Sequence, residues 1–151
     1  MAITLLESYP GTYALVLHLH APQTLTVGAL GAWAFPAGDY VYVGSAWGPG
    51  GVAARLGRHL RGADKVRWHI DYVRRVMQPI YAWVAYQKHL ECAWAAHLLA
   101  LPQSQVIVPR FGASDCHCVT HFLYITGQTQ AIHFPSATTS LDLTTLSPVL
   151  Y

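Results

Sequence analysis

Charged residues and cysteines are scarce in this chain of 151 residues, and each shortage excludes a class of protein. Asp, Glu, Lys and Arg make up only 11% of the residues, yet no window approaches the ~20 apolar residues that a membrane-spanning helix needs. Three cysteines cannot all pair within one chain, and Cys116 and Cys118 are too close to bridge each other comfortably, so we expect reduced thiols. Residues 1–6 lack a basic flank and a small-residue cleavage site, so we expect no secretory signal. These absences predict a soluble cytoplasmic protein that has no membrane partner.

The length and the uniform composition predict one domain. A chain of this size can bury a substantial core without disulfides or metal. We see no internal repeat, low-complexity block or linker before the Ser- and Thr-rich C-terminal segment. We therefore expect one domain over residues 1–127 and a C-terminal extension or tail over residues 128–151, with poor order over residues 137–151.

The pattern of apolar residues predicts alternating strands and helices. Strands are expected at residues 14–20, 24–27, 32–35, 40–43, 80–86 and 121–125, with a further short extended segment at 106–108. Helices are expected to begin directly after Gly51 and to cover residues 68–77 and 90–101. The first four strands read as a meander. The predicted fold class is α/β (α+β), with a small mixed, largely antiparallel sheet flanked by helices.

We expect the chain to be organised around a strand, a glycine loop and a basic helix at residues 39–61. Residues 40–43 alternate aromatic and β-branched side chains, which is typical of a central strand that is apolar on both faces. Gly44 is expected to end this strand. Residues 45–51 contain three glycines and a proline, so the backbone there can adopt positive φ and approach a ligand closely.

The helix after this loop carries an apolar stripe, which predicts the face that packs on the sheet. Arg55 and His59 flank the stripe and should lean over the crevice between helix and sheet. Arg58 and Arg61 should point to solvent, where contact with phosphate and simple solvation are equally good explanations. The net charge of +2 does not by itself indicate nucleic acid. However, seven of the nine basic residues lie in one short region, which predicts an electropositive face. They are Arg55, Arg58, Arg61, Lys65, Arg67, Arg74 and Arg75.

Five features of the chain together resemble the GIY-YIG nuclease superfamily. They are Gly11-Thr12-Tyr13, Tyr42-Val43-Gly44, Arg55 on the following helix, His59 four residues later, and Glu91 on a later helix. Further runs resemble a small stand-alone, uncharacterised branch of that superfamily, sometimes attached to DNA-repair enzymes. These runs are residues 42–51, 67–72, 91–93, 111–112 and 114–116. The resemblance covers about residues 11–125 and implies a GIY-YIG-like fold, with a longer segment between the two motifs that fits an extra meander.

The resemblance also implies a divalent-metal-dependent endonuclease or nickase that hydrolyses DNA phosphodiester bonds, with DNA repair as a setting. Its partner would be DNA, including branched or damaged DNA, and its cofactor Mg²⁺ or Mn²⁺. The implied catalytic residues are Tyr13, Tyr42, Arg55, His59 and Glu91, with Glu91 as the metal ligand. The residues expected to bind nucleic acid are Ser45, Gly50, Gly51, Arg58, Arg61, Lys65 and Arg67.

These residue types suit the reaction on chemical grounds. Phosphodiester hydrolysis needs a base near the attacking water, positive charge on the non-bridging oxygens and stabilisation of the leaving alkoxide. Tyr13 could accept a proton only if Arg55 or a metal lowered its pKa from ~10. Arg55 offers a fixed fork of donors to phosphate. Glu91 is one of two glutamates and could hold a hydrated divalent ion as a single carboxylate.

A non-catalytic nucleic-acid-binding accessory domain is the alternative function. Many catalytic relatives use an asparagine late in the domain, and this sequence contains none. The two tyrosines could equally be core residues, and Glu91 could merely complement the dipole of its helix. His69 and Asp71 are expected to form a hydrogen-bond network at a helix start, although a histidine near the site could also donate a proton.

A structural zinc or thiol site at Cys116 and Cys118 is a third, weaker alternative. Thiolates and imidazoles bind Zn²⁺, and His121 lies close by in sequence. The spacing matches no standard ribbon or finger, so a fourth ligand would have to come from Cys92 or His97. A thiol nucleophile paired with His121 is less favoured, because nothing in the loop indicates a lowered cysteine pKa. A small buried turn capped by Asp115 would need no metal at all.

Overall fold

Six strands form one antiparallel sheet in this computed structural model, which describes residues 6–145. Their spatial order is β6-β7-β4-β1-β5-β8, and every pairing between them is antiparallel. The strands are β1 (Gly11–Leu19), β4 (Gly38–Ala46), β5 (Gln78–Tyr86), β6 (Ser104–Val106), β7 (Phe122–Ile125) and β8 (Thr139–Asp142). The predicted α+β class is confirmed, and the sheet expected to be mixed is antiparallel throughout the described part of the chain.

The expected meander is wrong, because β1 pairs directly with β4. The two strands between them, β2 (Gln23–Thr26) and β3 (Ala32–Phe35), form a separate two-stranded sheet around the short 3₁₀ helix η1 (Gly28–Leu30). β1 and β4 are nine residues long and almost wholly buried, whereas β2 and β3 are largely exposed. Pairing the two buried strands therefore satisfies their backbone groups inside the core, where water cannot.

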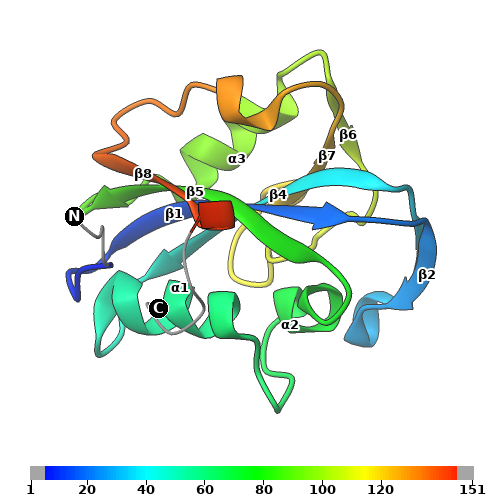
Figure 1. Ribbon diagram of the computed structural model, residues 1–151, viewed down its shortest axis with the longest axis horizontal. Coiled ribbons are helices and arrows are strands. Elements are labelled where there is room, and N and C mark those ends of the chain that lie inside the picture. The colour runs from blue at the N-terminus through cyan, green and yellow to red at the C-terminus, as the bar shows by residue number, and fades with distance from the viewer. Residues whose placement is uncertain (1–5, 146–151) are drawn as a thin grey trace.

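Helices cover both faces of the sheet (Figure 1). α1 (Gly51–Arg61) and α2 (His69–Arg74) lie on one face, and α3 (Glu91–Leu99) lies on the other. Tyr40 and Tyr42 of β4 join the core beneath α1, while Val41 and Val43 join the core beneath α3. This confirms that the strand is apolar on both faces. Among the described residues no helix has the length and apolar character to cross a bilayer. Since both faces are covered, an open site must lie at an edge or end of the sheet.

Several predicted boundaries are wrong, and pairing with β1 explains two of them. Gly44 does not end β4, because the pairing continues to the partners Gly11 and Ala46. The second helix is shorter than residues 68–77, since the Val76 and Met77 amides both bond the Val73 carbonyl in a closing turn. Residues 78 and 79 then pair with β1 as the start of β5. α3 is likewise shorter than the predicted helix at residues 90–101. The short extended segment predicted at 106–108 is β6, which lies at 104–106.

Residues after 127, expected to form an extension or tail, contribute to the sheet and its packing. β8 pairs with β5, so the expected poor order is wrong for residues 139–142. Two 3₁₀ helices, η2 (Thr129–Ala131) and η3 (Leu143–Thr145), precede and follow this strand. Ile132 and Phe134 are buried in the core beneath α3. Residues 146–151, also included in that prediction, lie outside the described residues.

Candidate active site

The candidate site lies where β7 stops short of the end of β4. β7 pairs with β4 only as far as Tyr42, and the Val43 amide donates to the His121 carbonyl. Among residues 6–145, no strand therefore pairs with β4 on that side from Gly44 to Ala46. A pocket of about 310 Å³ opens there, between α1, the start of α3 and the loop of residues 111–121. It is lined by Tyr42, Ser45, Arg55, Arg67, Trp68, His69, Glu91, Gly112, Ser114, Asp115 and Cys116.

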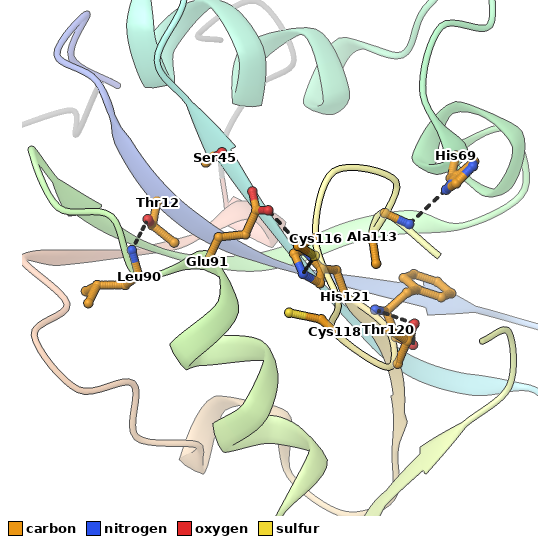
Figure 2. Close-up of polar contacts among 12 residues, drawn as sticks. Thr12, Ser45, His69, Leu90, Glu91, Ala113, Cys116, Cys118, Thr120 and His121 are labelled. Atoms are coloured by element: carbon orange, nitrogen blue, oxygen red, sulfur yellow. Dashed lines mark hydrogen bonds and ion pairs between the residues drawn. The ribbon is translucent and has the colours of Figure 1, made fainter. Parts of the chain in front are cut away.

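The pocket has two walls. The arginine wall, formed by β4, α1 and the start of α2, consists of Tyr42, Ser45, Arg55, Arg67 and Trp68. The loop wall, formed by α3 and the 111–121 loop, consists of Glu91, Gly112, Ser114, Asp115 and Cys116. Figure 2 shows Glu91 reaching from the start of α3 toward this loop. Three of the five expected catalytic residues, Tyr42, Arg55 and Glu91, thus meet in one pocket.

The other two expected catalytic residues, Tyr13 and His59, are buried behind the pocket. Tyr13 is 0% exposed and His59 is 2% exposed. The Tyr13 hydroxyl lies 2.8 Å from His59 Nε2. The Tyr13 and Tyr42 rings are neighbours, with centroids 6.3 Å apart. His59 also contacts Tyr42 edge-on. Tyr13 and His59 therefore form a hydrogen-bonded pair that supports Tyr42 from below.

The glycines of the two motifs are required by packing. Tyr13 faces Gly44 directly across the β1–β4 pair, and a Cβ on Gly44 would lie 2.6 Å from the Tyr13 ring and hydroxyl. A Cβ on Gly11 would meet the Ala85 carbonyl oxygen of β5. Both distances are shorter than a carbon atom tolerates. Gly44 of the second motif therefore makes room for Tyr13, and Gly11 of the first motif makes room for the backbone of β5.

Burial keeps the three aromatic groups of this cluster neutral. Burial, reinforced by the neighbouring Tyr42, raises the pKa of Tyr13 well above its ordinary value, and the opposing effect of Arg55 is smaller. Burial and the charge of Glu91 likewise raise the pKa of Tyr42. Burial lowers the pKa of His59 to about 3, so this imidazole is neutral at pH 7. Catalysis by Tyr13 would need a lowered tyrosine pKa, whereas the surrounding residues raise it.

Arginine side chains gather around a tryptophan that the sequence reasoning did not select. The guanidinium carbons of Arg55, Arg58 and Arg67 lie 4.6, 4.5 and 4.9 Å from the centre of the Trp68 ring. Arg55 Nη1 also donates to the Ser45 carbonyl at 2.6 Å, which fixes its fork at the pocket. A second pocket of about 250 Å³ shares Arg55, Arg67 and Trp68 with the first, so the positive charge continues beyond the site. The position of Trp68 within the basic region of the sequence could have indicated that it belongs to the site.

Arg58 does not point freely to solvent, contrary to the prediction. Its guanidinium donates to both carboxylate oxygens of Asp71 at 2.9 and 3.1 Å, and to the Lys65 carbonyl. Asp71 also accepts the backbone amides of Arg67 and Trp68. Burial acts to raise the pKa of Asp71, but these hydrogen bonds from Trp68 and Arg58 lower it. The network expected for Asp71 is confirmed, while Arg61 is exposed as expected.

The glycine loop is used mainly for packing. Gly50 is exposed with φ of 83°, whereas Gly51 is buried where a Cβ would collide with the Tyr9 carbonyl. The amides of Val52 and Ala53 at the start of α1 donate to the Tyr9 and Glu7 carbonyls. Those amides are therefore not available to cradle a phosphate. Of the other residues expected to bind nucleic acid, Ser45 and Arg67 line the pocket and Lys65 is exposed.

Glu91 is positioned by a threonine that the sequence reasoning missed. The buried Thr12 hydroxyl accepts the Leu90 amide at 2.9 Å and donates to the Lys88 carbonyl, which fixes the start of α3 (Figure 2). The Glu91 side chain is 30% exposed, and its Oε1 lies 3.3 Å from His121 Nδ1. Alternation along β1 could have indicated that Thr12 faces α3, on the side of the sheet opposite Tyr13.

His69 serves the loop wall rather than the helix start. Its Nδ1 accepts the Gly112 amide at 2.8 Å, which ties the loop to α2 (Figure 2). Since Nδ1 is the acceptor, any proton on the neutral ring is carried by Nε2. Burial lowers the pKa of His69, which favours this neutral form.

The ligand atoms of Cys92, Cys116, Cys118 and His121 all lie within 4.8 Å of one another. Cys92 thus supplies the fourth member that the zinc alternative required. The other candidate, His97, bonds the His133 carbonyl instead, at 2.7 Å from Nε2. Figure 2 shows Cys116, Cys118 and His121 grouped beside Glu91.

Comparison with known proteins places the chain in a family defined by its sequence. Neither the curated proteins nor the solved structures include one that matches it. A family model described as "Domain of unknown function DUF123" matches residues 12–141, which runs from the first motif through nearly all of β8. The chain therefore belongs to the DUF123 family.

Proposed function

We propose that this protein is a divalent-metal-dependent endonuclease or nickase that hydrolyses DNA phosphodiester bonds. The observation that carries the proposal is the meeting of Tyr42, Arg55 and Glu91 in one pocket at the free edge of β4. Their resemblance to the GIY-YIG motifs supports the same reading, and we infer that the domain is GIY-YIG-like.

The pocket offers oxygen ligands that suit Mg²⁺ or Mn²⁺. The Glu91 carboxylate, the Asp115 carboxylate and the Ser45 and Ser114 hydroxyls belong to its lining residues. Hard divalent cations prefer oxygen ligands and retain several waters, so one fixed carboxylate with nearby oxygens is a suitable donor set. When bound, the ion would supply Lewis-acid charge for the phosphoryl oxygens and the leaving alkoxide.

Arg55 and Tyr42 take the remaining roles in this proposal. Arg55, held by the Ser45 carbonyl and the Trp68 ring, presents its guanidinium to a non-bridging phosphate oxygen. Tyr42 lines the pocket, and no described residue hydrogen-bonds its hydroxyl. Once neighbouring positive charge lowers its pKa and its own proton passes to solvent, this oxygen, as a phenolate, would accept a proton from the attacking water. Tyr13 and His59 hold the Tyr42 ring in place, and this proposal moves the base from Tyr13 to Tyr42.

The groove beside the pocket suits the backbone of DNA. The three guanidiniums around Trp68 line a second pocket that adjoins the first. Clustered arginines neutralise successive phosphates, and this part of the interaction does not depend on base sequence. Branched or damaged DNA is a suitable substrate, because its helix is easily opened at the site of distortion.

A non-catalytic nucleic-acid-binding domain is the second candidate. The observation that favours it is the burial of Tyr42 near Glu91, since both raise the pKa of the Tyr42 hydroxyl and oppose base chemistry. The arginines around Trp68 would bind a phosphate backbone equally well without turnover.

Glu91→Gln separates the two candidates, with Glu7→Gln as the matched control at the only other glutamate. Wild type and both variants are incubated with a labelled branched duplex in Mg²⁺, Mn²⁺ or chelator, and cleavage and binding are measured separately. We expect Glu91→Gln to abolish metal-stimulated cleavage while binding DNA in chelator as wild type does, and Glu7→Gln to cleave normally. DNA binding without cleavage by the wild-type protein in every metal would support the second candidate and contradict the first.

A further inference from the structure

We propose that Cys92, Cys116, Cys118 and His121 bind one structural Zn²⁺ ion, which joins α3 to the loop of residues 111–121 within the loop wall of the pocket. This site is distinct from the proposed Mg²⁺ or Mn²⁺ site, although Glu91 lies between the two. Its evidence is independent of nuclease activity.

The distances agree with tetrahedral coordination. All four ligand atoms lie within 4.8 Å of one another, and Cys116 Sγ is 3.4 Å from His121 Nε2. Zn–S bonds of about 2.3 Å and Zn–N bonds of about 2.0 Å place a sulfur and a nitrogen of one tetrahedron roughly 3.5 Å apart. One ion can therefore reach all four atoms with only small side-chain adjustments.

The chemistry of the ligands selects zinc over the harder ions. Three thiols and one imidazole are soft or borderline donors, which Mg²⁺ and Ca²⁺ disfavour. A Cys₃His set fills the four positions of a tetrahedron and leaves none for water, as in structural rather than catalytic zinc sites. Binding requires thiolates, so the thiols release their protons to solvent as the metal–sulfur bonds form.

Hydrogen bonds from one arginine hold the loop in the shape that brings the cluster together. Arg110, whose backbone has φ of 68°, donates from its guanidinium to the carbonyls of Ala113, Cys116 and Cys118. This wraps the loop around one side chain and brings its two cysteines together. Cys92 approaches from a different element, near the start of α3. The ion would thus link two segments that are separated in the chain by the rest of α3 and by β6.

His121 has the outer contact expected of a zinc ligand. Its ring is fully buried, and with Nε2 facing Cys116 its Nδ1 lies 3.3 Å from Glu91 Oε1. This pair is too poorly aligned to count as a hydrogen bond, so the buried Nδ1 is left without one in the described part of the chain. Zinc-bound histidines usually donate their other N–H to a carboxylate or carbonyl, which fixes the ring. A small rotation of Glu91 on metal binding would complete that contact.

Metal content tests the proposal. Zinc is measured in protein purified under reducing conditions, and Co²⁺ is then exchanged into the site, where thiolate coordination gives a charge-transfer band. We expect one zinc per chain in wild type and in His117→Ala, which alters an exposed histidine of the same loop outside the cluster. Cys92→Ser and Cys118→Ser should lose stoichiometric zinc and the cobalt band. Cys92 is exposed, so its replacement should leave the fold intact.

Two results would overturn the proposal. One is reduced wild-type protein that binds neither Zn²⁺ nor Co²⁺ at one ion per chain. The other is Cys92→Ser and Cys118→Ser proteins that keep their zinc as His117→Ala does.

Glu91→Gln provides a second measurement of the arrangement. Loss of an outer carboxylate typically weakens metal affinity by ~10–100-fold, so this variant should bind zinc more weakly by that factor in a chelator competition. Hydrogen exchange should also show faster exchange in residues 111–121 on zinc removal, with the amides of α1 unchanged. Unchanged zinc affinity in Glu91→Gln would contradict the role of the carboxylate, and equal exchange of the loop with and without zinc would contradict a structural ion.

Discussion

The arginine wall and the loop wall of the pocket are held in place by different kinds of interaction. The arginine wall rests on the core beneath α1, with Tyr13 and His59 buried behind it and guanidiniums fixed around Trp68. The loop wall also reaches the core, through Phe111 of the loop and Trp94 and Leu98 of α3. It depends on Arg110 and His69 hydrogen bonds, on Thr12 at the start of α3, and on the proposed zinc. We therefore propose that folding alone organises the arginine wall, whereas a metal ion completes the loop wall.

This difference assigns different properties to the two walls. Groups on the arginine wall should keep their geometry in chelator, so phosphate binding should survive metal removal. Side chains on the loop wall, including Glu91, should become less ordered when zinc is removed.

Tyr42→Phe should cause the largest loss. It keeps the ring and its packing but removes the hydroxyl that lines the pocket, so cleavage should fall by ~10²–10⁴-fold with DNA affinity and melting temperature maintained. Single-turnover cleavage kinetics measure this effect, with Tyr9→Phe as a control at an exposed tyrosine. Cleavage by Tyr42→Phe at the wild-type rate would remove Tyr42 from the chemistry.

Tyr13→Phe should act through structure instead. It leaves His59 Nε2 without its partner in the core, which should lower the free energy of unfolding by about 1–3 kcal/mol. Its effect on cleavage should be smaller than that of Tyr42→Phe. A larger effect on cleavage, with unchanged stability, would restore Tyr13 as the base.

Acid should destabilise the arginine wall through His59. Its folded pKa is about 3, below the ordinary 6.5, so between these values the unfolded chain holds a proton that the folded chain does not. The free energy of unfolding should therefore fall as the pH drops from 6.5 toward 3, by up to about 1.4 kcal/mol per pH unit from this residue. Urea unfolding across this range should show a steeper fall for wild type than for His59→Gln. Equal slopes would mean that His59 is protonated in the folded protein.

Arg58→Ala should cost stability rather than DNA affinity alone. It removes two charged hydrogen bonds from the buried Asp71, which retains the Arg67 and Trp68 amides. We expect a loss of about 1–3 kcal/mol in the free energy of unfolding by urea. Arg75→Ala, at an exposed arginine of the same basic region, should change it little. Equal free energies of unfolding for the two variants would mean that Arg58 behaves as a solvated surface residue.

Arg61→Ala should give the smallest effect, because this side chain is exposed. If it contacts one phosphate, the slope of log affinity against log salt should flatten by up to about one unit. Titrations at several salt concentrations measure the slope, with Lys88→Ala outside the basic region as the control. A slope identical to that of wild type would assign Arg61 to simple solvation.

The contrast between the walls also explains what the sequence could predict. Tyr42 and Arg55 lie on a strand and the helix that follows it, so local periodicity was enough to bring them together. Glu91 and Cys92 meet the 111–121 loop only through the tertiary fold, and no local pattern reports that distance. The sequence therefore left the fourth zinc ligand open between Cys92 and His97. The Arg58–Asp71 pair was missed for the same reason, because helical periodicity describes one helix and not its neighbour.

Relaxation of supercoiled plasmid by zinc-loaded wild-type protein tests the central claim most directly. The protein is assayed with Zn²⁺ alone, after addition of Mg²⁺ or Mn²⁺, and after chelation. The account predicts nicking or cutting only when Mg²⁺ or Mn²⁺ is added, since zinc completes the loop wall but leaves the hydrolytic site at Glu91 without its ion. Plasmid that is bound but never nicked, under every metal condition, would contradict it.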